Sequence, residues 1–135
     1  MAKTFQLEII ASDHPFYKGD CEMLIFPAID GEHGILANHE AMVTCLRAGE
    51  LRFLVDGNWR FAAVSDGFVE ITPQYVVLLA DTVERPEDID VNRASEAKIR
   101  AEEKLRQKQS IMEYYHTQAA LNRAMSRLKV TKRHM

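Results

Sequence analysis

The stretch Val83-Glu84-Arg85-Pro86-Glu87-Asp88 divides the chain into two parts with different sequence patterns. Before it, short segments of β-forming residues are separated by turns that contain Gly, Asp and Asn. After Pro86, the chain continues to its last residue without another Gly or Pro. Because these two residues mark turns and interrupt helices, the change in pattern predicts a β-stranded body, residues 1–84, and a helical arm, residues 85–135.

The distribution of charge changes near the same place. Residues 1–97 carry 7 basic and 17 acidic side chains, whereas residues 98–135 carry 10 basic and 3 acidic side chains. The prediction is therefore an acidic body that holds a basic arm. At 135 residues, the chain has about the length of one average domain, which leaves no room for a large enzyme core beside the arm.

No stretch of the sequence has the length of a membrane span. The longest apolar run covers residues 75–80, far below the ~18 residues that a spanning helix needs. The N-terminal residues alternate between polar and apolar side chains, which is typical of a strand and unlike a secretory signal. We therefore expect a soluble protein that is able to sit on a membrane-bound partner.

Alternating side chains indicate strands throughout the body. Residues 4–10 place Phe5, Leu7 and Ile9 on one face, which is a period of two. Similar short segments follow at residues 22–27, 34–36, 42–45, 51–55, 59–64, 68–71 and 75–80. Most are joined by turn pairs in which Gly is expected to supply a positive φ: Asp30-Gly31, Ala48-Gly49, Asp56-Gly57 and Asp66-Gly67. Many short strands without an intervening helix predict an antiparallel sandwich or barrel.

The periodicity changes to that of helices after Pro86. Two sets of residues recur at intervals of three or four: Ala94, Ala97, Ala101 and Leu105, then Tyr114, Thr117, Leu121, Ala124 and Leu128. They predict helices over residues 90–108 and 111–129, with Asp88 as the N-terminal cap of the first. Alanine seams allow close antiparallel packing but bury little apolar area, so we expect a weakly held hairpin that can open.

Residues that would form a catalytic or metal site are not clustered in the sequence. Cys21 and Cys45 lie far apart without a C-x-x-C pattern, and we expect both to be reduced thiols in the core. The histidines, His14, His33, His39, His116 and His134, are scattered, and no phosphate-binding G-x-x-x-x-G-K loop occurs. Neither a metal site nor a catalytic triad is indicated, and we expect no catalytic residues.

Two other classes of protein compete with a structural role. A nucleic-acid-binding module would use the basic helices to bind phosphate backbones. The acidic body, and the place of the only tryptophan, Trp59, in a strand pattern, argue against a platform for stacking bases. A small hydrolase would need a nucleophile beside a base, and the sequence shows no such pair. Salt-dependent binding to bulk DNA would favour the first class, and hydrolytic turnover would favour the second.

Five motifs across both parts of the chain carry a family resemblance. They are GEHGILANH (31–39), AGELR (48–52), SDGFVEI (65–71), LADT (79–82) and IDVNRA (89–94). In this order, they resemble the epsilon subunit of F-type ATP synthases over essentially the whole chain. One departure is Ala37-Asn38, which stands where the family usually has Pro-Gly or a similar pair.

The resemblance implies an α+β fold in which an N-terminal antiparallel β-sandwich, residues 1–84, precedes a C-terminal two-helix antiparallel hairpin, residues 85–135. In this family, the sandwich binds the gamma subunit and the rotor ring of c subunits, and it couples rotation to the catalytic head of alpha and beta subunits. The hairpin inhibits ATP hydrolysis, and the subunit has no catalytic activity of its own. The implied location is the cytoplasmic face of the cell membrane, as a peripheral part of a proton- or sodium-translocating complex.

The resemblance also implies contact residues. By motif position, the turn that holds Asp30, Glu32 and His39 resembles the contact with the rotor ring. The basic residues of the arm are expected to meet acidic surface on the catalytic head when the arm extends: Arg123, Arg127, Lys129, Lys132 and Arg133. No nucleic acid is expected as a partner.

The IDVNRA motif resembles the I/L-D-x-x-R-A motif of nucleotide-binding epsilon subunits from bacilli. By position, the resemblance implies an ATP-binding set of Glu84, Ile89, Asp90, Arg93, Ala94, Arg100, Arg123 and Arg127. Helical spacing places Arg93 with Arg100, and Arg123 with Arg127, so antiparallel packing can gather four guanidinium groups around phosphates. ATP is then a regulatory ligand that favours the closed arm and is not hydrolysed. The alternative is that these arginines only form salt bridges with Glu96, Glu102 and Glu103.

Overall fold

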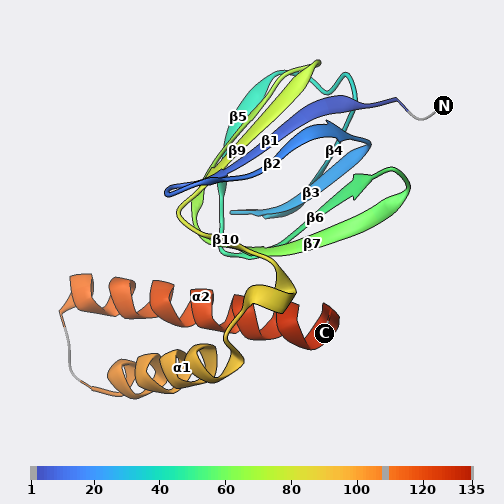
Figure 1. Ribbon diagram of the computed structural model, residues 1–135. Helices are drawn as coiled ribbons and strands as arrows, with labels where there is room; N and C mark the ends of the chain where they lie inside the picture. Colours follow the sequence, from blue (N-terminus) through green and yellow to red (C-terminus); the bar gives the residue numbers. More distant parts are fainter. Residues whose placement is uncertain (1–2, 108–109, 135) are drawn as a thin grey trace.

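The computed structural model describes residues 3–107 and 110–134, which form a β-sandwich with a helical hairpin packed against one end (Figure 1). The strands are β1 (Phe5–Ala11), β2 (Pro15–Cys21), β3 (Met23–Ala28), β4 (Gly31–Leu36), β5 (Met42–Leu46), β6 (Gly49–Val55), β7 (Asn58–Val64), β8 (Gly67–Ile71), β9 (Tyr75–Ala80) and β10 (Val83–Glu84). The helices are η1 (Pro86–Asp88), a short 3-10 turn, α1 (Val91–Leu105) and α2 (Ile111–His134). The predicted fold class, a β-sandwich followed by a two-helix hairpin, is confirmed.

One continuous 10-stranded sheet bends to form both layers of the sandwich. Its order is β10-β7-β6-β3-β5-β8-β9-β1-β2, and β4 pairs with β3. The bend lies between β3 and β5, which are joined by the single pair Ala28 and Leu46. All strand pairs are antiparallel except β1 with β9, which run parallel. The sandwich is therefore antiparallel as predicted, apart from this one parallel pair, which the sequence pattern did not indicate.

The alternation of side chains explains why these segments become strands. In β1, Phe5, Leu7 and Ile9 are at most 3% exposed and point into the core, while the residues between them lie at or near the surface. The same period of two places Leu24 and Phe26 of β3 in the core. Apolar burial from both layers is the main force that holds the sandwich together.

Sequence patterns missed two strands. In β2, the sequence PFYKGDC lacks clear alternation and starts with proline, and the strand lies at the end of the sheet, paired only with β1. Edge strands tolerate such residues because one side of the strand has no ladder to complete. At the opposite end, β10 has only 2 residues, too few for a periodicity to appear.

The glycines of the predicted turns have two different roles. Gly31 and Gly57 have φ of 119° and 76°, as expected for residues that supply a positive φ. That expectation is wrong for Gly49 and Gly67, which have no positive φ. At Gly67, an added Cβ would lie 1.8 Å from the carbonyl oxygen of Leu79, so this glycine allows β8 and β9 to approach closely.

The Ala37-Asn38 pair forms a turn with a positive φ of 65° at Asn38. Asparagine adopts this left-handed conformation more readily than most residues, which explains how the chain accommodates Asn at this position. The backbone N–H of Asn38 donates to the carbonyl oxygen of Pro73 at 3.1 Å. The loop after β4 is thereby tied to the turn between β8 and β9.

The first helix of the hairpin begins at Val91, one residue later than predicted, and its capping residue lies two residues later. Asp90, rather than Asp88, caps α1, and its carboxylate accepts a hydrogen bond from the Arg93 backbone N–H at 3.0 Å. Asp88 instead ends η1, and the extended backbone of Ile89 separates the two helices. The expected end of the first helix at residue 108 lies outside the described residues. The second helix continues to His134, beyond the predicted residue 129, because its last turns pack against the sandwich.

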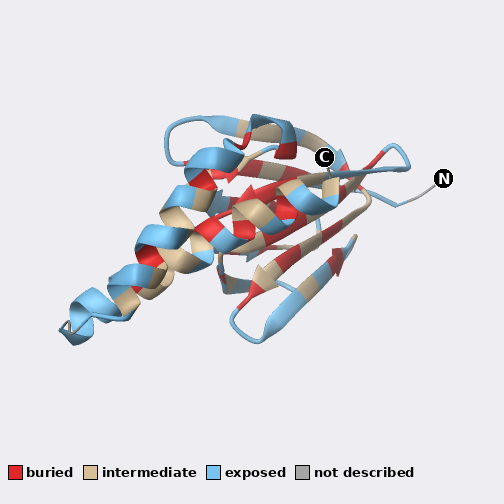
Figure 2. Ribbon diagram, turned by 90° about the horizontal axis from the view of Figure 1, so that it is seen from below, coloured by how far each residue is buried: buried red, intermediate tan, exposed pale blue. Residues whose placement is uncertain are grey.

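Small residues line the contact between the helices, as the alanine seams predicted. Ala94 and Ala101 of α1 and Ala124 of α2 are at most 5% exposed. On its other side, α2 contacts the sandwich, where Val130 joins Ala63 and Ile89 in a small buried cluster. Figure 2 shows buried positions along both helices where the hairpin lies over the sandwich, whereas the described residues near the far end of the hairpin are mostly exposed. In the described part of the chain, neither helix has both the length and the apolar composition needed to cross a bilayer.

The two thiols differ in environment, and the expectation that both lie in the core is wrong for Cys45, which is exposed on β5. Burial raises the pKa of the Cys21 thiol to about 11. Because the thiolate is the reactive species, we expect iodoacetamide at pH 8 to alkylate Cys45 while Cys21 stays unmodified. Tandem mass spectrometry of the tryptic peptide 19–47, which contains both cysteines, locates the modified thiol, and full alkylation of Cys21 in the folded protein would contradict this expectation.

Candidate functional site between the hairpin and the sandwich

An ion pair attaches the middle of α2 to the last strand of the sandwich. Arg127 Nε donates to Glu84 Oε1 at 2.6 Å, and both side chains are less than one third exposed. The same guanidinium also donates from Nη2 to Thr82 Oγ1 at 3.4 Å. Since β10 is only 2 residues long, this contact fixes α2 to the point where the chain leaves the sheet.

Arg123 lies one helical turn before Arg127 and lines the same narrow cleft, together with Ser65 and Thr82. The floor of the cleft is rigid because the Thr82 backbone N–H donates to Ser65 Oγ at 2.8 Å and the Ser65 backbone N–H donates to the Thr82 carbonyl at 3.1 Å. Two guanidinium groups thus line a cleft that leaves no room for a water molecule in the closed arm, so an anion can enter only if Arg123 or Arg127 moves.

The other members of the predicted ATP-binding set lie nearby or elsewhere on the hairpin. Ile89 and Ala94 are buried, and Asp90 caps α1. Arg93 is exposed in the first turn of α1, whereas Arg100 lines a separate groove between the helices, with a volume of about 260 Å³. The structure thus brings Arg123, Arg127 and Glu84 together but places Arg100 in a different groove.

The alternative prediction, in which the arginines pair only with Glu96, Glu102 and Glu103 of the hairpin, is wrong for Arg127. Among the described residues, the carboxylate that pairs with Arg127 is Glu84, and Glu96, Glu102 and Glu103 take part in no ion pair. The partner of Arg127 therefore belongs to the sandwich. Breaking this pair releases α2 from the body rather than from α1.

A second polar contact, at Glu50, holds the C-terminal end of α2. Glu50 Oε2 accepts a hydrogen bond from Arg133 Nη1 at 3.0 Å and lies 3.1 Å from His134 Nε2. The His134 ring stacks on Phe61 with centroids 3.7 Å apart and an interplanar angle of 15°. Glu50 is only 8% exposed, and its Oε1 lies 3.7 Å from Arg52 Nε. A nearly buried carboxylate thus lies among cationic and imidazole groups.

Sequence reasoning did not single out Glu50. It belongs to the AGELR motif, where Glu50 and Leu51 are both buried although neighbouring residues of a strand normally face opposite sides. The basic residues at the end of α2 suggest that an acidic partner exists, because Arg133 and His134 both pair with Glu50. Their sequence does not indicate which acidic residue of the sandwich is that partner.

The three residues expected to contact the rotor ring do not share one turn. Asp30 lies in the turn between β3 and β4, and Glu32 lies in β4 and pairs with Arg52 at 3.0 Å. His39 follows the other end of β4. At the first end, a hydrogen bond from His33 lowers the pKa of Asp30 below its ordinary value. Asp30 and Glu32 therefore form one acidic surface, whereas His39 lies on a different part of the protein surface, at the other end of β4.

Two family models match the chain in succession. The model "ATP synthase, Delta/Epsilon chain, beta-sandwich domain" matches residues 4–86, and "ATP synthase, Delta/Epsilon chain, long alpha-helix domain" matches residues 87–132. The chain belongs to the ATP synthase delta/epsilon family. The predicted family is thereby confirmed.

Individual relatives of this delta/epsilon chain agree with the assignment. The "ATP synthase epsilon chain" of Ruminiclostridium cellulolyticum is 48% identical over 96% of this chain and 97% of its own length. The protein of the same name from Caldanaerobacter subterraneus subsp. tengcongensis is 44% identical, over 99% and 98% of the two chains. A chain in the mitochondrial ATP synthase structure of Euglena gracilis has the same fold, with a TM-score of 0.80 at 21% identity over 91% of this chain and 78% of its own.

The sandwich of this delta/epsilon chain also has an exposed apolar face. Val43, Phe68 and Leu79 lie in the neighbouring strands β5, β8 and β9. Their side chains are 70%, 59% and 46% exposed. Phe68 pairs directly with Cys45 and Leu79, so these side chains lie side by side. Exposed apolar groups gathered on one sheet face are typical of a protein contact.

No group of three or more His, Cys, Asp or Glu in the described ranges is placed to hold a metal.

Proposed function

We propose that this protein is the epsilon subunit of the central stalk of an ATP synthase and that its hairpin restrains ATP hydrolysis when it leaves the sandwich. The observation that carries this proposal is the way the hairpin is docked. Few apolar contacts hold α2, namely Val130 against Ala63 and Ile89 and the His134 ring against Phe61, while ion pairs at Glu84 and Glu50 add polar contacts. Such an interface opens at low free-energy cost, as a switch requires.

The proposed partners divide between two surfaces of the sandwich. The apolar face of Val43, Phe68 and Leu79 is suited to the gamma subunit, because a long-lived contact buries apolar area. The acidic surface of Asp30 and Glu32 is assigned to the rotor ring of c subunits, with His39 at the other end of β4 as a further contact. Through these partners, the protein is peripheral on the cytoplasmic face of the cell membrane and adds no catalytic residues to the alpha and beta subunits.

We further propose ATP as a regulatory ligand of the closed hairpin. The cleft of Arg123 and Arg127 supplies two guanidinium groups, and Arg93 and Arg100 lie on the neighbouring helix. ATP phosphates compete with Glu84 for Arg127, so binding exchanges an internal ion pair for an external one. We propose that ATP binds without being hydrolysed.

Isothermal titration calorimetry of the isolated protein with ATP tests this ligand. We expect saturable binding with a dissociation constant in the micromolar to millimolar range, and at least about tenfold weaker binding by Arg93→Ala and Arg127→Ala. Arg106→Ala, an exposed arginine just after α1, is the matched control and should bind normally. Absence of binding by the unmodified chain at millimolar ATP would exclude the sensor role but not the structural one.

Charge reversal on the exposed side of α2 tests inhibition separately. Lys129 and Lys132 are exposed and have no ion-pair partner among the described residues, so their replacement leaves the docking contacts intact. We expect Lys129→Glu with Lys132→Glu to raise ATP hydrolysis by the assembled enzyme severalfold, because the extended arm loses its attraction to acidic surface. Unchanged hydrolysis would count against an electrostatic contact with the catalytic head. Lys129→Gln with Lys132→Gln should give an intermediate rate.

A further inference from the structure

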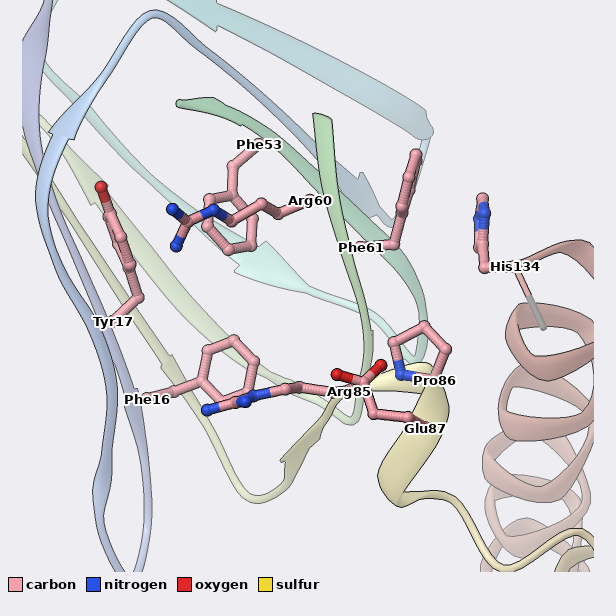
Figure 3. A pocket seen from close by; sticks show the side chains of 9 residues that line it. All are labelled: Phe16, Tyr17, Phe53, Arg60, Phe61, Arg85, Pro86, Glu87 and His134. Carbon is pink, nitrogen blue, oxygen red and sulfur yellow. The ribbon is translucent and has the colours of Figure 1, made fainter. Parts of the chain in front are cut away.

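A cavity of about 390 Å³ lies where the end of the arm meets the sandwich, and it is separate from the cleft of Arg123 and Arg127 (Figure 3). Four aromatic side chains from three strands form much of its wall: Phe16 and Tyr17 of β2, Phe53 of β6 and Phe61 of β7. The rings of Tyr17 and Phe53 are tilted against each other with centroids 5.1 Å apart. The volume lies within the ~300–1,000 Å³ that small-molecule sites occupy.

Two guanidinium groups reach into this cavity. Arg60 Cζ lies 5.5 Å from the ring centroid of Tyr17, and Arg85 Cζ lies 5.9 Å from that of Phe16. Figure 3 shows Arg60 above and Arg85 below, with both side chains extending toward β2. Within residues 3–107 and 110–134, neither guanidinium has an ion-pair partner. The rings therefore hold the two cations in place while their N–H donors stay free for a ligand.

One carboxylate, that of Glu87, also lines the cavity, so two cations face one anion. His134 extends the aromatic wall because its ring lies flat on Phe61, as Figure 3 shows. We propose that this cavity binds a small planar aromatic ring carrying one anionic group, a carboxylate or a phosphate. The ring packs against the aromatic wall, and the anionic group accepts hydrogen bonds from Arg60 and Arg85.

Binding at this cavity is coupled to the position of the arm. The sandwich supplies Phe16, Phe53 and Arg60, whereas the connection at Arg85 and the end of α2 at His134 supply other parts of the lining. Opening of the arm removes His134 and with it part of the site. A ligand therefore binds the closed arm and stabilises it. This inference is independent of nucleotide binding at Arg123 and Arg127.

Calorimetric titration of the full chain with 2-naphthoate and, separately, with AMP tests the site and distinguishes a carboxylate from a phosphate ligand. We expect saturable binding of at least one of them, with a dissociation constant below about 1 mM. The neutral ring 2-naphthalenemethanol should bind at least about tenfold more weakly, because it has no group for the arginines. Amide hydrogen exchange in the last turn of α2 should slow when the anion is added.

Variants separate this cavity from other cationic sites. Arg60→Ala and Arg85→Ala should each weaken binding at least about tenfold, and both residues are exposed, so the fold is preserved. Arg47→Ala, an exposed arginine that lines another groove, and Arg123→Ala should bind with full affinity. The site is overturned if neither anion binds at millimolar concentration, or if the Arg60→Ala/Arg85→Ala double variant binds as tightly as the unmodified chain.

Discussion

Replacement of Gly67 by alanine is expected to destabilise the sandwich strongly. The new Cβ would lie 1.8 Å from the Leu79 carbonyl oxygen and 2.8 Å from Ala80 Cα, which are both backbone atoms. Gly67 and Ala80 are paired in the ladder between β8 and β9, so the clash is relieved only by separating the two strands. We expect a loss of more than about 3 kcal/mol in the free energy of unfolding, a large part of the ~5–15 kcal/mol of a typical domain.

Urea denaturation followed by far-ultraviolet circular dichroism measures this loss. Gly34→Ala is the matched control, because its Cβ would meet only the end of the flexible Met23 side chain, at 3.3 Å, and Gly34 has no positive φ. We expect the control to lie within about 1 kcal/mol of the unmodified protein. Equal stability of Gly67→Ala and Gly34→Ala would show that β8 and β9 are not as closely packed as described.

Removal of the Glu50 carboxylate is expected to release the end of the arm while leaving the sandwich folded. Glu50→Ala deprives Arg133 and His134 of their shared partner, and loss of one member of a nearly buried ion pair is costly. We expect docking of the last turns of α2 to weaken by about 2–3 kcal/mol. Amide hydrogen exchange in residues 127–134 should then accelerate about 30-fold to 100-fold or more.

The control for this variant is Glu32→Ala, because Glu32 also pairs with Arg52 but is exposed and does not contact α2. Exchange in the helix should be unchanged in the control, since exposed ion pairs contribute at most about 1 kcal/mol. Glu50→Gln should have a smaller effect than Glu50→Ala because the amide oxygen still accepts one hydrogen bond. If the extended arm inhibits as proposed, Glu50→Ala should also lower ATP hydrolysis by the assembled enzyme. Unaltered exchange in Glu50→Ala would remove Glu50 from the docking contact.

The parts of the fold that could be predicted from the sequence are those set by local periodicity. The alternation in residues 4–10 predicts β1, and the spacing of Ala94 and Ala101 predicts the buried side of α1. The loss of Gly and Pro after Pro86 places the boundary between the two parts. In each case, a pattern within a few residues decides which side chains are buried.

The parts that could not be predicted depend on distant partners. Short-range periodicity carries no information that β1 pairs parallel with β9, or that the polar segment of β2 completes the sheet. Asp88 and Asp90 are both acceptable caps by residue type, and the extended backbone at Ile89 decides between them. Gly67 has a turn-type neighbour, Asp66, but its role depends on the backbone of β9.

The candidate site shows the same division between local and distant information. Helical spacing correctly places Arg123 and Arg127 together, since both line one cleft. The pairing of Arg127 with Glu84, and of Arg133 with Glu50, depends on how the arm lies on the sandwich, which spacing within a helix does not specify. ATP binding by this set stays a prediction for calorimetry.

The parallel pairing of β1 with β9 has a consequence for the order in which the chain acquires its structure. Leu7 lies opposite Val76, so most of the sandwich must be synthesised before this pair can form. Closure of so long a loop is slow compared with formation of a helical hairpin, whose contacts are local. On the ribosome, β1 and β2 can associate early, but the apolar side of β1 stays uncovered until Ala80 has emerged. Interrupted synthesis before that residue leaves Phe5, Leu7 and Ile9 available for aggregation.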